Sequence, residues 1–152
     1  MLVSDRTGVK MRKVERIVGI AKDTLEFILE VSKSTHPREF IGMLCADDDL
    51  ITDIFFLPGT ISSDEKAIIR LDMMPMGLRY AGSVHSHPHP GSTRPSRQDL
   101  LMFSKTGNWH IIVCYPYEMV DWRCYNAKGE ERKLELVERE LEQEEVGEEQ
   151  LW

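Results

Sequence analysis

The sequence predicts one mixed α/β domain, in which a β-sheet is flanked by helices. Its 152 residues are within the usual length of a single domain. Short apolar runs typical of strands outnumber the segments with helical periodicity and alternate with them irregularly. Hydrophobic residues make up 41% of the chain and charged residues 30%, as in an ordinary globular protein. A domain of this length buries enough surface to fold without disulfides or a structural metal.

The first half of the chain is expected to begin with a strand, or the lead-in to one, at residues 13–20. A helix follows at 21–34, where apolar residues recur at helical spacing: Ala21, Leu25, Ile28 and Leu29. Pro37 ends this helix because the residue before a proline is disfavoured in the helical conformation. The run 40–45 is continuously apolar, which is typical of a strand buried on both faces. The three aspartates at 47–49 lack the pattern of a calcium-binding loop, so they are interpreted as a hairpin turn.

The second half is expected to contain the remaining strands and one more helix. The predicted strands are 50–57, 67–71, 80–87, 109–115, 120–124 and a last one that ends near Val137. A Met-rich turn at 73–77 is interpreted as packing, the commoner use of methionine. A loop rich in Pro, Gly and Ser at 88–95 leads to a helix at 96–105, which closes near Gly107.

Acidity is concentrated at the C-terminus. The net charge is −7, and residues 138–150 contribute seven glutamates and one arginine, or −6, which leaves −1 for the rest of the chain. We therefore divide the chain into a domain at 1–137 and an acidic tail at 138–152, expected to be a solvated appendage. The nearly neutral body lacks the basic stripe that nucleic-acid binding requires, so nucleic acid is not an expected partner.

The sequence indicates neither a membrane segment nor a disulfide framework. Its apolar runs are much shorter than a membrane span, and its first residues lack the apolar stretch of a secretory signal. The three cysteines, Cys45, Cys114 and Cys124, are odd in number and contain no Cys-x-x-Cys pair. We expect buried free thiols and a cytoplasmic protein with no membrane partner.

The most informative pattern is His85-Ser86-His87, at the end of a predicted strand. Residues two apart in a strand point to the same face, so the two imidazoles can converge on one metal ion. Pro88 ends the strand directly after them, which places the pair beside an accessible loop. Asp99, on the following helix, would be a third ligand. A fourth tetrahedral position is then left for water, which is the catalytic rather than the structural arrangement of zinc.

The same residues allow other interpretations. Histidine has many roles besides metal binding, and a lone His-x-His pair more often serves one of those. Ser96 and Asp99 also form a capping box, and the two roles are compatible because a carboxylate has two oxygens. His89 lies on the loop beyond the strand, where we expect it to be exposed rather than a ligand. Ser86 points to the opposite face from the histidines and is assigned a packing role.

The stretch from His85 to Leu100 closely resembles the signature of JAMM (MPN-domain) metalloproteases, which reads His-x-His, a spacer and Ser-x-x-Asp. The resemblance extends over about 21–136 and is greatest to the short, stand-alone prokaryotic members. The upstream glutamate of that family matches Glu39, which follows the first long helix. The spacer here is eight residues, 88–95, where the family usually has seven, and an insertion in such a loop costs little. All the ligand types are intact.

This resemblance implies a single MPN/JAMM domain of cytidine-deaminase-like architecture with one catalytic Zn²⁺ per chain, held by His85, His87 and Asp99. It implies a zinc metallopeptidase of the isopeptidase type, which hydrolyses peptide or isopeptide bonds at the C-terminus of ubiquitin-like proteins. Glu39 would be the general base, and Ser96 would donate a hydrogen bond to the developing oxyanion.

Alternatives stay open at this point. The substrate could instead be a sulfur-carrier protein with a C-terminal extension, and the family also includes metal-free scaffolds that only bind partners. A zinc deaminase is disfavoured, because its signature places a glutamate two residues after its histidine and adds Pro-Cys-x-x-Cys, both absent from this chain. The expected partner is therefore a ubiquitin-like or sulfur-carrier protein, and a homodimer stays open.

Overall fold

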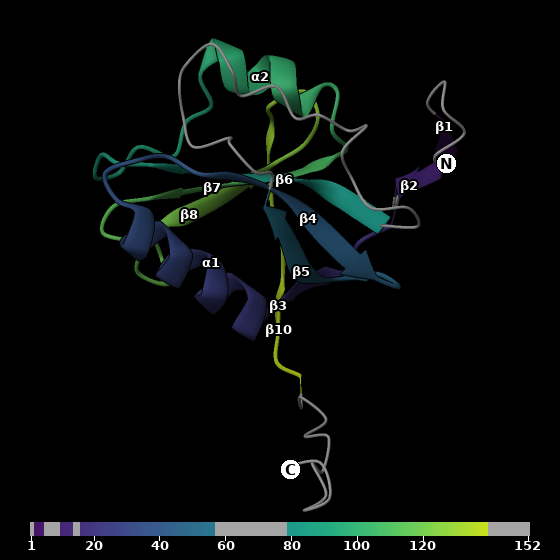
Figure 1. The fold of residues 1–152 in the computed structure, drawn as a ribbon, viewed down its shortest axis with the longest axis horizontal. Coiled ribbons are helices and arrows are strands. Elements are labelled where there is room, and N and C mark those ends of the chain that lie inside the picture. Colours follow the sequence, from purple (N-terminus) through teal and green to yellow (C-terminus); the bar gives the residue numbers. More distant parts are fainter. Residues whose placement is uncertain (1, 5–9, 14–15, 57–78, 140–152) are drawn as a thin grey trace, which may run out of the picture.

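The computed structural model describes residues 2–4, 10–13, 16–56 and 79–139. In chain order the strands are β1 (Leu2–Ser4), β2 (Lys10–Lys13), β3 (Gly19–Ala21), β4 (Ile41–Asp47), β5 (Leu50–Phe56), β6 (Arg79–His87), β7 (Trp109–Cys114), β8 (Trp122–Tyr125), β9 (Glu131–Arg132) and β10 (Leu136–Val137). The helices are α1 (Lys22–Thr35) and α2 (Arg97–Phe103). Figure 1 shows the two helices on opposite sides of the strands.

All the described strands belong to one mixed sheet, which confirms the predicted fold class. Its order is β10-β3-β5-β4-β6-β7-β8-β9, and the β1–β2 pair joins the beginning of β6 through β2. Neighbours along this order are antiparallel except for three parallel pairs, β10–β3, β3–β5 and β6–β7. The two strands at the ends of the order, β9 and β10, are separated in the chain only by residues 133–135. The sheet must therefore curl so that its two ends approach each other.

The long helix lies within one residue of the predicted bounds, although Ala21 ends β3 instead of beginning the helix. Leu25, Ile28 and Leu29 are buried on one face of α1, as the helical spacing of apolar residues indicated. The hydroxyl of Thr24 donates to the carbonyl of Thr52 at 2.8 Å, which ties the beginning of the helix to β5. The helix ends at Thr35, two residues before Pro37.

Several predicted boundaries shift. The strand expected at 13–20 is confined to β3, and the last strand is divided between β9 and β10. It divides because β9 pairs with β8 at one end of the sheet, whereas β10 pairs with β3 at the other. Val120 lies in the turn before β8 and is 76% exposed, so it does not share the inward face of that strand. The strand expected at 67–71 and the Met-rich turn lie outside the described residues.

Two apolar clusters cover the two faces of the sheet. The larger one joins α1 to the face that carries Leu44, Val84 and Ile111. The smaller one lies under α2 and contains Met102 and Phe103 of that helix together with five strand residues: Ile41, Met43, Tyr80, Ile112 and Tyr125. From Gly82 to His87 the side chains of β6 alternate between an α1 face and an α2 face, whereas a register shift against β4 places Tyr80 on the α2 face and Ala81 on the α1 face.

The cysteines are free and buried, as expected. Neither described helix is long and apolar enough to cross a membrane. At the beginning of the acidic tail, Glu138 bonds Lys22 at 3.2 Å, and Arg139 makes a two-pronged contact with the carboxylate of Asp23 at 3.0 and 3.1 Å. The tail from 140 to 152 lies outside the described residues.

Candidate metal centre

The C-terminal end of β6 carries the two histidines. Its backbone is held from both sides there, because His85 is paired with Ile41 of the antiparallel β4 and with Ile112 of the parallel β7. His85 and His87 project to the α2 face, and their Nε2 atoms lie 3.1 Å apart. His85 is 2% exposed. Its ring also lies against Phe103 of α2, with ring centroids 6.2 Å apart.

The N-terminus of α2 places the third candidate ligand. Ser96 caps the helix: its hydroxyl accepts the N–H of Asp99 at 3.1 Å, and its own N–H donates to Oδ2 of Asp99 at 2.7 Å. The same carboxylate reaches both histidines, with Oδ1 3.1 Å from Nε2 of His85 and Oδ2 3.3 Å from Nε2 of His87. The capping role and the ligand role that the sequence allowed therefore coexist in one carboxylate.

The longer spacer does not displace Asp99. Nδ1 of His87 donates to the carbonyl of Ser92 at 2.8 Å, and the hydroxyl of Tyr125 donates to the carbonyl of Thr93. These bonds fasten the middle of the loop to β6 and β8. The eighth spacer residue is accommodated in the loop, since the helix still begins beside the histidines.

The three side chains fit a tetrahedral zinc ion. Bonds of about 2.0–2.1 Å to such an ion place ligand atoms about 3.3–3.4 Å apart. The Nε2 atoms of the two histidines, 3.1 Å apart, are close to this edge length, and each lies 3.1 or 3.3 Å from a different oxygen of the Asp99 carboxylate. Nδ1 of His87 is protonated when it donates to Ser92, which leaves the Nε2 lone pair for a metal, as is usual for ligating histidines. Nδ1 of His85 is buried and has no hydrogen-bond partner among the described residues.

The electrostatics of the cluster are those of a carboxylate held between two imidazoles. Burial acts to raise the pKa of Asp99, but the hydrogen bonds from His85 and His87 outweigh it and hold the pKa well below its ordinary value. Burial acts to lower the pKa of His87, but the bonds to Asp99 and to the Ser92 carbonyl outweigh it, so this pKa is raised. The carboxylate is therefore ionised at neutral pH, which is the state that binds a cation.

Glu39 lies in the segment between α1 and β4, far from the other candidates in the sequence. Pairing of β4 with β6 brings it to the same end of the sheet, and its charge helps to raise the pKa of His87. It is half-buried. The structure thus brings the four predicted acidic and imidazole side chains into one neighbourhood.

Ser86 has a more specific role than the packing predicted for it. On the α1 face, its hydroxyl accepts the N–H of Phe40 at 3.0 Å, and its own N–H donates to the carbonyl of Phe40 at 3.2 Å. Ser86 therefore fastens the residue next to Glu39 to the strand that carries the histidines. The sequence signal was available, because a polar residue between two inward positions of a buried strand needs a hydrogen-bond partner.

The other two candidates lie as the sequence suggested. The Ser96 hydroxyl accepts the Asp99 N–H, and this role as acceptor leaves its own hydrogen to be donated to another group. His89 is exposed on the loop and is not part of the His85, His87 and Asp99 group.

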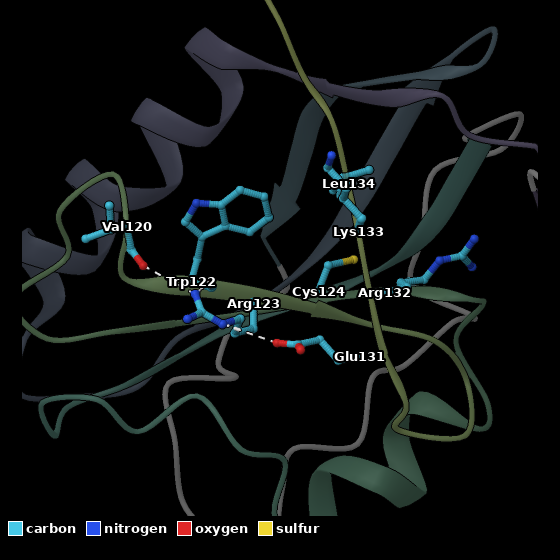
Figure 2. Close-up of a pocket in the computed structure, with 8 residues that line it drawn as sticks. All are labelled: Val120, Trp122, Arg123, Cys124, Glu131, Arg132, Lys133 and Leu134. Carbon is cyan, nitrogen blue, oxygen red and sulfur yellow. Dashed lines mark hydrogen bonds and ion pairs between the residues drawn. The ribbon is translucent and has the colours of Figure 1, made fainter.

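A hollow of about 600 Å³ lies elsewhere, between Trp122 of β8 and the segment 131–134 (Figure 2). Its lining belongs to the α1 side of the sheet, where Cys124 and Leu134 join the larger apolar cluster. Arg123, which lines the hollow, is paired with Glu131 at 3.2 Å. The hollow therefore lies apart from His85, His87 and Asp99, and its lining residues contain no comparable group of metal ligands.

Comparison with known proteins agrees with this geometry. Residues 21–125 match the family described as prokaryotic homologs of the JAB domain. A Haloferax volcanii protein named "Probable metalloprotease" is 36% identical over 143 residues, which covers 88% of each chain.

Two solved structures are similar along nearly their whole length. A JAB1/MPN domain protein from Archaeoglobus fulgidus is 46% identical with a TM-score of 0.66, covering 79% of this chain and 99% of that one. A structure described as "JAMM: A Metalloprotease-like Zinc Site in the Proteasome and Signalosome" is 43% identical with a TM-score of 0.65, covering 80% of this chain and 99% of that one. The chain therefore belongs to the prokaryotic JAB-domain family, whose relatives include JAMM/MPN proteins with a metalloprotease-like zinc site.

Proposed function

We propose that this protein is a zinc-dependent peptidase that hydrolyses peptide or isopeptide bonds at the C-terminus of ubiquitin-like proteins. The observation that carries the proposal is the convergence of His85, His87 and Asp99, whose ligand atoms all lie within 4.8 Å of one another. Glu39, which is close enough to influence His87, supplies a carboxylate that the metal group does not use. The similarity of this chain to a solved structure described as containing a metalloprotease-like zinc site also supports the proposal.

Each residue has a distinct task in this proposal. Bound zinc supplies Lewis acidity, which makes a water molecule more acidic and polarises a carbonyl group. Glu39 takes the proton of the attacking water and later delivers it to the leaving amine. The Ser96 hydroxyl donates to the oxygen of the scissile carbonyl as negative charge develops there.

Selectivity is proposed to rest on the acyl side of the scissile bond. Only residues 104–108 connect α2 to β7, so no long insertion is present there to grip the leaving side. An extended tail ending in Gly-Gly suits a narrow channel, because glycine brings backbone without a side chain. β6 offers no free edge beside the metal group, since Phe40 and Tyr115 bond its backbone from the two sides. The tail must therefore pair with another segment.

The test uses purified zinc-loaded protein and the host's ubiquitin-like conjugates, with and without a chelator. Cleavage that the chelator abolishes and added zinc restores is expected. Matched substrates then locate the selectivity. A bulky residue in place of the penultimate glycine should suppress cleavage strongly, whereas changing the leaving residue should matter little. The reverse pattern would reject the ubiquitin-like assignment.

The same experiment separates the alternatives. Cleavage of a sulfur-carrier protein with a C-terminal extension, but not of lysine-linked conjugates, would support processing of sulfur-carrier C-termini instead. A non-catalytic scaffold would cleave neither substrate. The intact His85, His87 and Asp99 group disfavours that alternative, because scaffolds of this type lack ligands.

A further inference from the structure

We propose that Tyr117 is a positioning residue, which holds the segment bearing Glu39 in place through its hydrogen bond with His36. The inference rests on the proposed role of Glu39 as general base. It concerns a residue beyond the metal-binding pattern, in the connection between β7 and β8.

The contact joins the end of α1 to the β7–β8 connection. The hydroxyl of Tyr117 and Nδ1 of His36 are hydrogen-bonded at 2.8 Å. Tyr115 stacks on His36, with its ring centroid 4.7 Å from that of His36 and an interplanar angle of 27°. The N–H of Tyr115 donates to the carbonyl of His87 at 3.2 Å, so this cluster is itself fastened to the metal-binding strand.

The backbone at Tyr117 indicates that its side chain is needed. Its φ is 65°, in the left-handed region that large residues seldom adopt and that glycine enters without steric cost. Its N–H bonds the carbonyl of Cys114 at 2.8 Å, which closes a tight turn. Such conformations persist where the surroundings hold them, and they are concentrated at functional sites. The ring of Tyr117 is 2% exposed, directed toward His36 rather than solvent.

Glu39 lies between two anchors. His36 is held by Tyr117 on one side, and Phe40 is held by Ser86 on the other. The backbone between them is short, consisting of Pro37, Arg38 and Glu39, and the N–H of Arg38 bonds the carbonyl of Thr35 at 2.9 Å. A tether this short, fixed at both ends, limits the positions that the Glu39 carboxylate can occupy.

The charge of Glu39 acts on the same cluster. Burial raises the pKa of the Tyr117 hydroxyl, and coulombic interactions with Cys114, Glu39 and Tyr115 raise it further. Glu39 also raises the pKa of His87. The carboxylate is therefore within electrostatic reach of both the positioning cluster and the metal group.

The first test is turnover of a linear fusion in which a peptide follows the Gly-Gly of a ubiquitin-like protein. Tyr117→Phe keeps the ring and removes the hydroxyl. We expect kcat to fall about tenfold, since misplacing a reacting group by an ångström costs on the order of a hundredfold. KM and zinc content should change less than about twofold. In a Glu39→Gln background, Tyr117→Phe should have almost no further effect, because it acts through Glu39.

Two further variants complete the turnover test. His36→Phe removes the other partner of the bond while keeping an aromatic ring against Tyr115, and it should reproduce the loss. Tyr80→Phe is the matched control, since Tyr80 is 2% exposed and its hydroxyl bonds none of the described residues. Equal losses from Tyr117→Phe with and without Glu39, or more than half of wild-type kcat in Tyr117→Phe, would overturn the proposal.

The second test does not depend on activity. Amide hydrogen exchange at Arg38 and Glu39 should become faster in zinc-loaded Tyr117→Phe, while exchange at His85 to His87 stays unchanged. Unchanged exchange at Arg38 and Glu39 would show that Tyr117 does not hold the segment. If wild-type protein cleaves no fusion, the proposed function fails, and the exchange measurement still decides whether this tether exists.

Discussion

The three candidate metal ligands and Glu39 lie at the same end of β6, but different kinds of contact hold them there. His85, His87 and Asp99 come from one continuous stretch, in which a strand, a fastened loop and a capped helix follow each other directly. Glu39 comes from a connection more than forty residues earlier and arrives through the pairing of β4 with β6. The metal group is held by local geometry, whereas Glu39 is held by contacts between distant segments.

This difference predicts which substitutions separate metal binding from turnover. Removing one of the three ligands should remove the metal and therefore everything that depends on it. A change in the contacts that hold Glu39 should leave the metal bound and reduce only turnover.

Asp99→Ala should abolish both zinc binding and turnover, because it removes a ligand and one half of the helix cap. Elemental analysis should find about one zinc per chain in wild type and none in the variant. His87→Ala should behave in the same way. Removing zinc from wild type should lower the melting temperature without unfolding the protein, since the domain has its own core. Wild type that binds no supplied zinc would end the metalloenzyme proposal.

Glu39→Gln should retain zinc and lose turnover by about 10²- to 10⁴-fold, the usual contribution of a general base. The amide is nearly the same size as the carboxylate, so fold and metal content are expected to be unchanged. Kinetics and elemental analysis on the same sample provide the check. More than a tenth of wild-type activity would identify another group as the base.

Ser96→Ala should lower kcat by about 10²-fold, the lower end of what an oxyanion donor contributes. The variant also loses a helix cap, which costs about 1 kcal/mol of stability. Ser96→Thr retains the hydroxyl and serves as the control, and it should recover most of kcat. A threonine variant as slow as the alanine variant would argue against hydrogen-bond donation.

Ser86→Ala should lower kcat by about tenfold while zinc stays bound, because it removes one of the two hydrogen bonds that hold Phe40 to β6 and loosens the attachment of Glu39. Leaving the buried N–H of Phe40 without an acceptor should also destabilise the fold by about 1–3 kcal/mol. Ser34→Ala, which removes an exposed hydroxyl of α1, is the matched control. Loss of zinc in Ser86→Ala would show that zinc binding depends on the contacts that hold Glu39.

Deleting 140–152 should leave activity on a small substrate within about twofold, since the contacts that hold the metal group and Glu39 all lie before Arg139. Collapse of activity in this truncated protein would contradict the prediction.

Deleting 139–152 also removes the contact of Arg139 with Asp23, a partly exposed pair of a kind worth at most about 1 kcal/mol. That hydrogen bond lowers the pKa of Asp23. A lowered pKa stabilises the fold above the ordinary aspartate range, so the difference between the two truncations should fade as the pH falls through the Asp23 pKa. Thermal unfolding of the two truncated proteins at pH 7 and at acid pH measures this difference in stability.

Features that depend on short-range spacing could be predicted from the sequence. The helical period placed α1, the strand period placed His85 and His87 on one face, and the Ser96-to-Asp99 interval placed a cap on α2. Such features follow from backbone geometry over a few residues, and tertiary contacts do not alter them.

The meeting of distant segments could be seen only in the folded chain. The last predicted strand is divided because the curled sheet needs its two halves at opposite ends, which no local pattern encodes. The roles of Ser86 and Tyr117 depend on partners at Phe40 and His36, which are brought to them by sheet pairing and by a turn in a strained conformation. A hydrogen bond between such segments has no sequence period, so it becomes visible only when the chain has folded.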